Sequence, residues 1–264
     1  MAESDTSLAM LRHRMATIER QHRPEGTVAL GEAVATGHEA IDTALGGGLV
    51  RGRLHELFAA GVDDGPSAAG FATMLAVRFG GELIWLRQDR AEKRSGRLYA
   101  HGLSELGLDP AKVIMVLVDQ PLHLLRAAAD TIACSGNGTV IVELWQNPRE
   151  LDLTASRRLA MAAADAGVAL LMLRIDAEPQ PSAAWTRWRI AAAPSVPFEA
   201  HAPGLPTLTL ELTRHRQGPQ NRRWDVVWDR DAKCLMPREK EVARRAFMSD
   251  EPNRDAILTA YKTG

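Results

Sequence analysis

Five short apolar runs, separated by segments with helical periodicity, constrain the fold of this chain more than any other feature. The runs cover residues 54–58, 83–86, 113–118, 139–144 and 168–175. Helical patterns lie between them, near residues 66–79, 97–106, 121–134 and 149–166. Short continuous apolar runs are typical of strands that are buried on both faces, and their alternation with helices indicates βαβ units. The pattern predicts an α/β fold with a mainly parallel central sheet flanked by helices.

The pattern changes after residue 175, where prolines become frequent. Three later segments, 185–190, 207–212 and 224–228, alternate between apolar and polar residues. Such alternation is typical of antiparallel strands with one buried face. We expect these strands to extend one edge of the sheet.

The two ends of the chain read as appendages, which divides it into an N-terminal helical arm (1–26), a core (27–229) and a charged C-terminal tail (230–264). Apolar residues at helical spacing occur in both appendages and are Leu8, Leu11, Met15, Ile18, Phe247, Leu258 and Tyr261. Each stripe could pack on the chain's own core or dock on another protein, and the periodicity allows both.

Composition excludes several classes of function. The net charge is −1, so only a local patch could attract nucleic acid. The two cysteines, Cys134 and Cys234, form no CxxC motif, and the eight histidines form no HxxxH pair, so no metal site is expected. No run approaches the ~20 apolar residues that span a bilayer. We expect a cytoplasmic protein without a cofactor.

Residues 34–58, VATGHEAIDTALGGGLVRGRLHELF, form the most informative segment. Thr36 is expected to cap a short helix, and Gly46, Gly47 and Gly48 to form a turn with positive φ. The segment resembles the entry to the nucleotide-binding domain of the RecA family. The resemblance continues to residue 229, through LGLD (106–109), the strand 113–118 and Glu143 in the place of the Walker B acid. It implies a RecA-like core.

The chain departs from the RecA pattern at the residues that carry hydrolysis. A phosphate loop reads G-x-x-x-x-G-K-[ST], and its lysine neutralises the phosphates. Residues 54–77 contain no lysine or arginine, and Asp63 and Asp64 lie where a phosphate would bind. Arg87 and Gln88 occupy the place of the catalytic glutamate. The sequence therefore predicts a protein that is not an ATPase, with Glu143 as a buried strand residue.

A RecA-like core of this length without a phosphate loop resembles the ImuA family. YAHGL (99–103), GLDP (107–110) and RWRI (187–190) support that resemblance. It implies a non-catalytic adaptor in a DNA-damage-induced (SOS) translesion complex. The implied partners are a Y-family polymerase-like subunit, an error-prone replicative-type polymerase and RecA. A SulA-type division inhibitor, which would bind a tubulin-like protein, is the alternative, and an active ATPase with an unusual loop is the third interpretation.

One basic cluster could contact DNA or a partner, and it consists of Arg214, Arg216, Arg222, Arg223 and Trp224. A hairpin would bring its two ends together, with Trp224 available to stack on a base. Alternatively, the hairpin is solvated and Trp224 packs on the sheet. With so few cations, we expect at most weak, salt-dependent DNA binding. A second basic run, from Arg87 to Arg97, is interrupted by Asp89 and Glu92 and is expected to be a loop.

Overall fold

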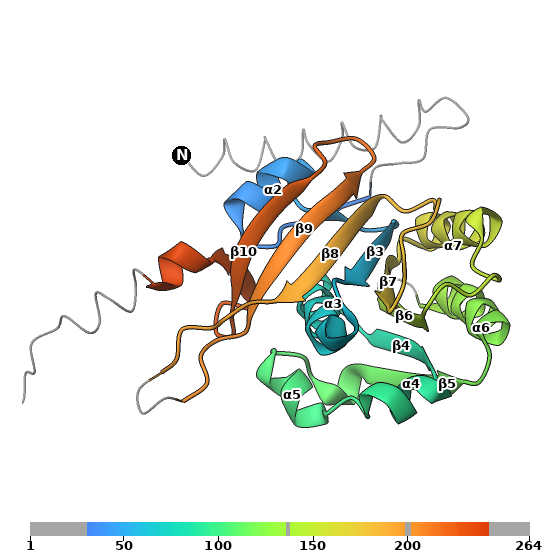
Figure 1. Ribbon diagram of the computed structural model, residues 1–264. Helices are drawn as coiled ribbons and strands as arrows, with labels where there is room; N and C mark the ends of the chain where they lie inside the picture. The colour runs from blue at the N-terminus through green and yellow to red at the C-terminus, as the bar shows by residue number, and fades with distance from the viewer. Residues whose placement is uncertain (1–30, 136–137, 199–201, 243–264) are drawn as a thin grey trace, which may run out of the picture.

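A nine-stranded sheet forms the centre of the computed structural model, which describes residues 31–135, 138–198 and 202–242 (Figure 1). The strands are β3 (Leu54–Ala59), β4 (Leu83–Gln88), β5 (Val113–Val118), β6 (Thr139–Trp145), β7 (Ala169–Ile175), β8 (Thr186–Ala192), β9 (Thr207–His215), β10 (Arg222–Asp229) and β11 (Cys234–Pro237). Their order in space is β11-β10-β9-β8-β3-β7-β6-β4-β5. The α/β fold expected from the alternating pattern is confirmed.

Parallel and antiparallel pairing meet at β8. Strands β5, β4, β6, β7 and β3 pair in parallel, and β8 also runs parallel to β3. From β8 outward, β9, β10 and β11 pair antiparallel. The late strands thus extend one edge of the sheet as expected, but the first of them belongs to the parallel half. The sheet also continues past residue 229 into the segment that the sequence places in the tail.

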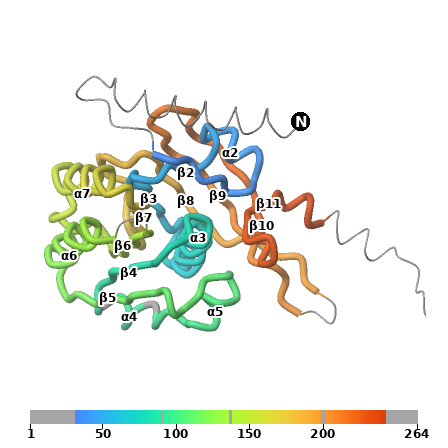
Figure 2. Tube along the Cα trace, turned by 180° about the vertical axis from the view of Figure 1, so that it is seen from behind, coloured from blue at the N-terminus to red at the C-terminus, as the bar shows by residue number. Residues whose placement is uncertain are grey.

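Helices cover both faces of the sheet. Their bounds are α2 (Glu39–Leu45), α3 (Gly65–Phe79), α4 (Asp89–Ser95), α5 (Ala100–Glu105), α6 (Pro121–Cys134) and α7 (Leu153–Ala166). Residues of α2, α3 and α5 pack on one face, and residues of α6 and α7 pack on the other. Figures 1 and 2 show α6 and α7 side by side, with α3 on the opposite side of the sheet.

Large aromatic side chains fill the core on the α3 side. Trp85, Trp188 and Trp228 are fully buried, and Phe71 of α3 meets the Trp188 ring edge-on at a centroid distance of 6.0 Å. Each buried ring removes a large apolar area from water and stabilises the fold by a few kcal/mol, roughly 1.5–3 for an average apolar side chain. This face of β8 is therefore covered by α3.

The entry segment folds around Asp42 of α2. His38 is the N-cap, and its Nδ1 accepts from the Ile41 amide. Thr36, the expected cap, instead donates from its amide and its hydroxyl to Asp42 Oδ1 at 2.7 and 2.8 Å. The assignment of the cap to Thr36 was wrong because a carboxylate six residues away binds the Thr36 hydroxyl.

The glycine turn after α2 has the predicted backbone. Gly46, Gly47 and Gly48 have φ angles of 73°, 121° and 130°. A Cβ on Gly48 would lie 2.2 Å from the carbonyl oxygen of Val34, so this position excludes every other residue. The close approach lets β1 (Ala33–Val34) pair with β2 (Leu49–Val50) immediately before β3.

Candidate functional site

A five-residue connection lies at the carboxyl edge of the parallel strands, at the place in the chain where the RecA resemblance would put a phosphate loop. It runs from Ala60 to Asp64 and leads from β3 into α3. The Ala60 amide donates to the Ile190 carbonyl, and Asp64 Oδ1 accepts from the Ala192 amide at 2.7 Å. The connection is therefore bound to β8 on both sides, with Pro66 in the first turn of α3, where no amide hydrogen is needed.

A buried ion pair lies near the end of this connection, because its two residues line the same cavity as Gly65 and Pro66 at the start of α3. Arg87 of β4 and Glu143 of β6 are neighbours across the two strands, with Nη2 and Oε1 3.0 Å apart and both side chains 2% exposed. Trp85 donates to Glu143 Oε2 at 3.1 Å, and Trp145 donates to Oε1 at 3.2 Å. Both oxygens of the Glu143 carboxylate are thus held by groups of the protein.

A cavity of about 320 Å³ opens between α3 and α5 beside this pair. Gly65, Thr73, Arg87, Tyr99 and Glu143 are among its lining residues. Crevices at the carboxyl ends of parallel strands are the usual ligand sites of α/β sheets. Among the charged residues that line this crevice, Arg87 and Glu143 neutralise each other, and Arg97 pairs with Glu92 at 3.5 Å.

The segment expected to be a basic loop is largely helical. Residues Asp89–Ser95 form α4, in which Lys93 pairs with Asp89 at 3.2 Å; Arg97, just beyond the helix, pairs with Glu92 at 3.5 Å. The interpretation as a loop was wrong, because Asp89 provides Lys93 with a partner at helical spacing.

The predicted basic hairpin exists, but its arginines do not form one exposed cluster. Strands β9 and β10 pair with Arg222 opposite Leu212 and Arg223 opposite Glu211, and Arg222 and Arg223 are exposed. Arg214 is half-buried and donates to the Ser182 carbonyl at 3.0 Å. Trp224 packs on the core at a centroid distance of 6.1 Å from Trp188. The alternative in which this tryptophan packs on the sheet is the one that the structure shows.

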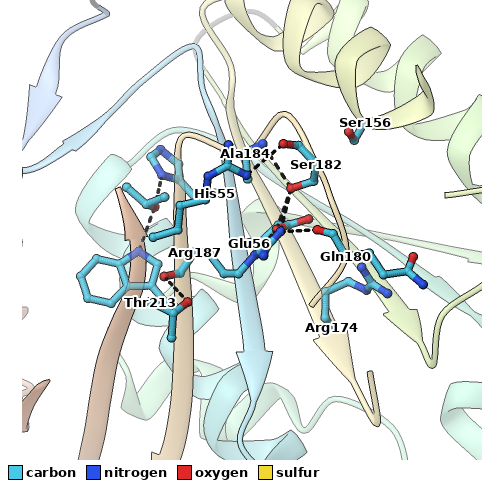
Figure 3. Close-up of polar contacts among 12 residues, drawn as sticks. His55, Glu56, Ser156, Arg174, Gln180, Ser182, Ala184, Arg187 and Thr213 are labelled. Carbon is cyan, nitrogen blue, oxygen red and sulfur yellow. Dashed lines mark hydrogen bonds and ion pairs between the residues drawn. The ribbon is translucent and has the colours of Figure 1, made fainter. Parts of the chain in front are cut away.

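A buried polar network on the opposite face of the sheet was not foreseen (Figure 3). Glu56 of β3 is 1% exposed, and its Oε2 accepts from Arg187 Nε at 2.8 Å and from Ser182 Oγ at 2.9 Å. Arg187 also donates to the Gln180 carbonyl. These bonds hold the segment between β7 and β8 against β3.

A second buried arginine lies beside this network. Arg174 of β7 donates from Nη2 to the Gln146 carbonyl at 2.9 Å and to Asn147 Oδ1 at 2.7 Å. Burial lowers its pKa to about 10, although the nearby Glu56 carboxylate opposes that shift. The sequence did contain a signal for this network: Glu56 and Arg174 are charged residues inside the otherwise apolar runs 54–58 and 168–175. A charge that is buried in a strand requires a partner, so each of them predicted a polar contact.

The edge strand β5 is exposed, contrary to the expectation that its run is buried on both faces. Its sequence, VIMVLV, contains no charge, yet Ile114 is 51% exposed, Met115 40% and Leu117 48%. Within the described residues no strand pairs with its outer side. Proteins usually protect such edges with charges or proline, and an unprotected apolar edge is a template for pairing with another chain.

The apolar residues that the sequence predicts to dock on a partner lie in the two ends of the chain. Leu8, Leu11, Met15, Ile18, Phe247, Leu258 and Tyr261 lie outside the described residues. Over the described ranges, no cluster of three or more His, Cys, Asp or Glu side chains could hold a metal ion. In the same residues, no helix is long and apolar enough to cross a membrane.

Fold and site together define an α/β protein with a mostly parallel, helix-flanked sheet and an internally neutralised crevice at its carboxyl edge. The chain is 33% identical over 211 residues to Protein ImuA of Caulobacter vibrioides strain NA1000 / CB15N, and equally to that of strain ATCC 19089 / CIP 103742 / CB 15. The alignment covers 73% of this chain and 82% of each relative. No family profile matches. The chain belongs to the ImuA family.

Proposed function

We propose that this protein is a non-catalytic adaptor with a RecA-like core in a cytoplasmic, DNA-damage-induced error-prone translesion complex. It binds a Y-family polymerase-like subunit or RecA, and through them an error-prone replicative-type polymerase. Family membership supports the damage-inducible mutagenesis system as its context. The observation that carries the adaptor role is the exposed apolar edge strand β5.

The edge of β5 suits one mode of docking in particular. An extended segment of a partner can add a strand to an open edge, so that main-chain hydrogen bonds provide affinity and side-chain contacts provide specificity. Ile114 and Leu117 fall on opposite faces of the strand, so an added segment would find apolar contacts on both sides. Leu122, at the start of α6, is a further exposed apolar residue close in sequence.

A substitution in the edge strand β5 should have the same effect on damage-induced mutation as deletion of the gene. We expect Leu117→Lys to weaken capture of the polymerase-like subunit or RecA about tenfold or more, because a lysine on an edge strand opposes the addition of another strand. Folding should change by less than about 0.5 kcal/mol, since Leu117 is an exposed residue. A chromosomal Leu117→Lys strain should then show the reduced damage-induced mutation rate of a deletion strain, with normal growth.

Val62→Lys is the matched control, because Val62 is also an exposed apolar residue, at 53%, but lies in the β3–α3 connection. It should retain partner capture and induced mutation. If the deletion strain keeps full induced mutagenesis, the proposed function is wrong. A deletion strain that fails only to arrest division would favour a SulA-type inhibitor of a tubulin-like protein instead.

The absence of catalysis is the second part of the proposal. The connection Ala60–Asp64 carries two acidic residues and no cation, and the nearby Arg87 is paired with Glu143. A nucleotide's phosphates would bury several negative charges there without a lysine to neutralise them. We expect calorimetric titration with ATP and Mg²⁺ to show no binding, with RecA from the same cell as the positive control. A Kd in the low micromolar range, or Mg²⁺-dependent hydrolysis, would contradict this.

A further inference from the structure

A groove lies at the amino edge of the parallel strands, opposite the crevice described above. It has a volume of about 410 Å³ and runs between α7 and the segment that precedes β8. Arg53 and Leu54 at the start of β3 line its base, and Arg214 and Arg216 at the end of β9 line one side. This volume is within the usual range of ligand-binding pockets, about 300–1,000 Å³.

Positive charge dominates the groove. Arg53, Arg157, Arg214 and Arg216 line it, against one acidic residue, Asp165. In the described part of the chain, no carboxylate forms an ion pair with Arg157, Arg214 or Arg216. A ligand that carries negative charge would therefore meet three guanidinium groups that are not neutralised.

One stripe of α7 adds apolar surface to this charge. Leu153, Arg157 and Met161 follow each other at spacings of four, and all three are exposed. Met161 is 66% exposed, so most of its side chain is available for contact with a ligand. The opposite stripe, which includes Leu159 and Ala163, is buried in the core. The helix thus presents a cation between two apolar side chains to the groove.

The facing wall of the groove is held in place by the buried network of Figure 3. Ser182 lines the groove and is bonded to Glu56 and Arg187, and the Ala183 amide donates to Ser156 Oγ of α7 at 3.0 Å. A wall bonded to both β3 and α7 is already ordered before a ligand binds. Binding to such a preformed site avoids part of the entropic cost of association.

The composition of the groove distinguishes between two anionic ligands. A nucleic acid would bind through phosphates and through bases stacked on an aromatic ring. The aromatic ring of this groove, Trp185, is 8% exposed, and the Arg53 guanidinium lies over it at 4.7 Å. It offers no stacking platform, whereas Leu153 and Met161 offer contacts that a phosphodiester backbone does not use. Adaptable methionine contacts are typical of peptide-binding surfaces.

We propose that this groove binds a segment of a partner protein in which acidic and apolar side chains alternate along one face. This inference rests on the proposed adaptor function and names the chemistry that the partner must present. The chain's own N-terminal arm is a poor occupant, because residues 6–22 contain three arginines and one glutamate. The groove is four strands away from β5, so the protein has two separate docking surfaces.

Charge reversal on α7 tests the proposal with a matched control. The purified full-length chain is titrated with the polymerase-like subunit, with RecA and with a 20-residue oligo-dT. For the partner that binds, Arg157→Glu should weaken binding about tenfold or more. Arg158→Glu carries the same charge change on the same helix, but Arg158 does not line the groove, so binding should stay within about twofold. Met161→Ser should weaken binding several-fold, because the lost contact is apolar.

The outcomes separate this inference from the proposed function. If the wild type binds a partner, and Arg157→Glu and Arg158→Glu both bind it as tightly as the wild type does, the groove is not the binding site. The adaptor function then still stands. If the wild type binds neither protein, the adaptor function fails and the inference fails with it. If oligo-dT binding is lost in Arg157→Glu and unchanged in Met161→Ser, the groove is a nucleic-acid site and the peptide assignment is wrong.

Discussion

Glu143→Leu is expected to lower the free energy of unfolding by about 3–5 kcal/mol. The substitution leaves the Arg87 guanidinium 2% exposed without its carboxylate, and it removes the acceptor of the Trp85 and Trp145 indole groups. The hydrogen bond from Arg87 Nη1 to the Gly96 carbonyl replaces only part of the hydration that this buried charge has lost. Urea denaturation followed by tryptophan fluorescence measures the loss.

The double variant Arg87→Met/Glu143→Leu is the informative control. A buried ion pair replaced by apolar side chains of similar volume is often neutral in stability, so the double variant should recover most of the loss. Recovery would show that the loss comes from the unpaired Arg87 charge and that the ion pair itself is not needed for folding. A loss below about 1 kcal/mol in the single variant would mean that Arg87 reaches water when unpaired.

Acid should destabilise the protein through His55 by about 3 kcal/mol. Burial lowers the pKa of His55 from 6.5 to about 4. Its Nε2 lies 2.9 Å from the Val50 carbonyl and must donate, so Nδ1 is the acceptor of the Thr186 hydroxyl at 2.7 Å. The Thr186 oxygen in turn accepts from Trp188 Nε1 at 2.9 Å. A proton on Nδ1 would leave that hydroxyl hydrogen without its acceptor.

The sign of the effect follows from proton binding. Between about pH 6.5 and pH 4 the unfolded chain binds a proton at His55 that the folded chain does not. Stability due to His55 is therefore complete above pH 6.5 and falls as the pH falls through this window. Denaturation at pH 7 and pH 4.5 should show a smaller acid-induced loss for His55→Gln than for the wild type. The same substitution at the exposed His101 is the control, and an equal loss in all three proteins would contradict the assignment.

The carboxyl edge shows what a local sequence pattern can and cannot reveal. That no G-x-x-x-x-G-K-[ST] motif follows β3 was visible in the sequence because such a motif consists of neighbouring residues. The Arg87–Glu143 pair was not, because its members are 56 residues apart and meet only through the register of β4 and β6. The sequence showed Arg87 and Glu143 as separate charged residues, but it did not show that they neutralise each other.

The hairpin and the groove illustrate the same limit. Arg214, Arg216, Arg222 and Arg223 read as one cluster, yet Arg214 and Arg216 line the groove and Arg222 and Arg223 do not. Arg157 joins the first two from a helix almost 60 residues away in the chain. Local spacing predicts that a strand turns back on itself, but it does not predict which distant helix lies beside the turn.

By itself, the sequence determined the alternation of the five parallel core strands with helices, the glycine turn before β3 and the family to which the chain belongs. These depend on local periodicity, on consecutive residues and on backbone conformations that only glycine adopts. Only the tertiary structure decided that β8 is parallel to β3, that the apolar run of β5 lies at an exposed edge, and that Glu56 binds Arg187. Each of these depends on which strand neighbours which. Apolar runs are interchangeable in pairing, so the choice is made by packing across the whole sheet.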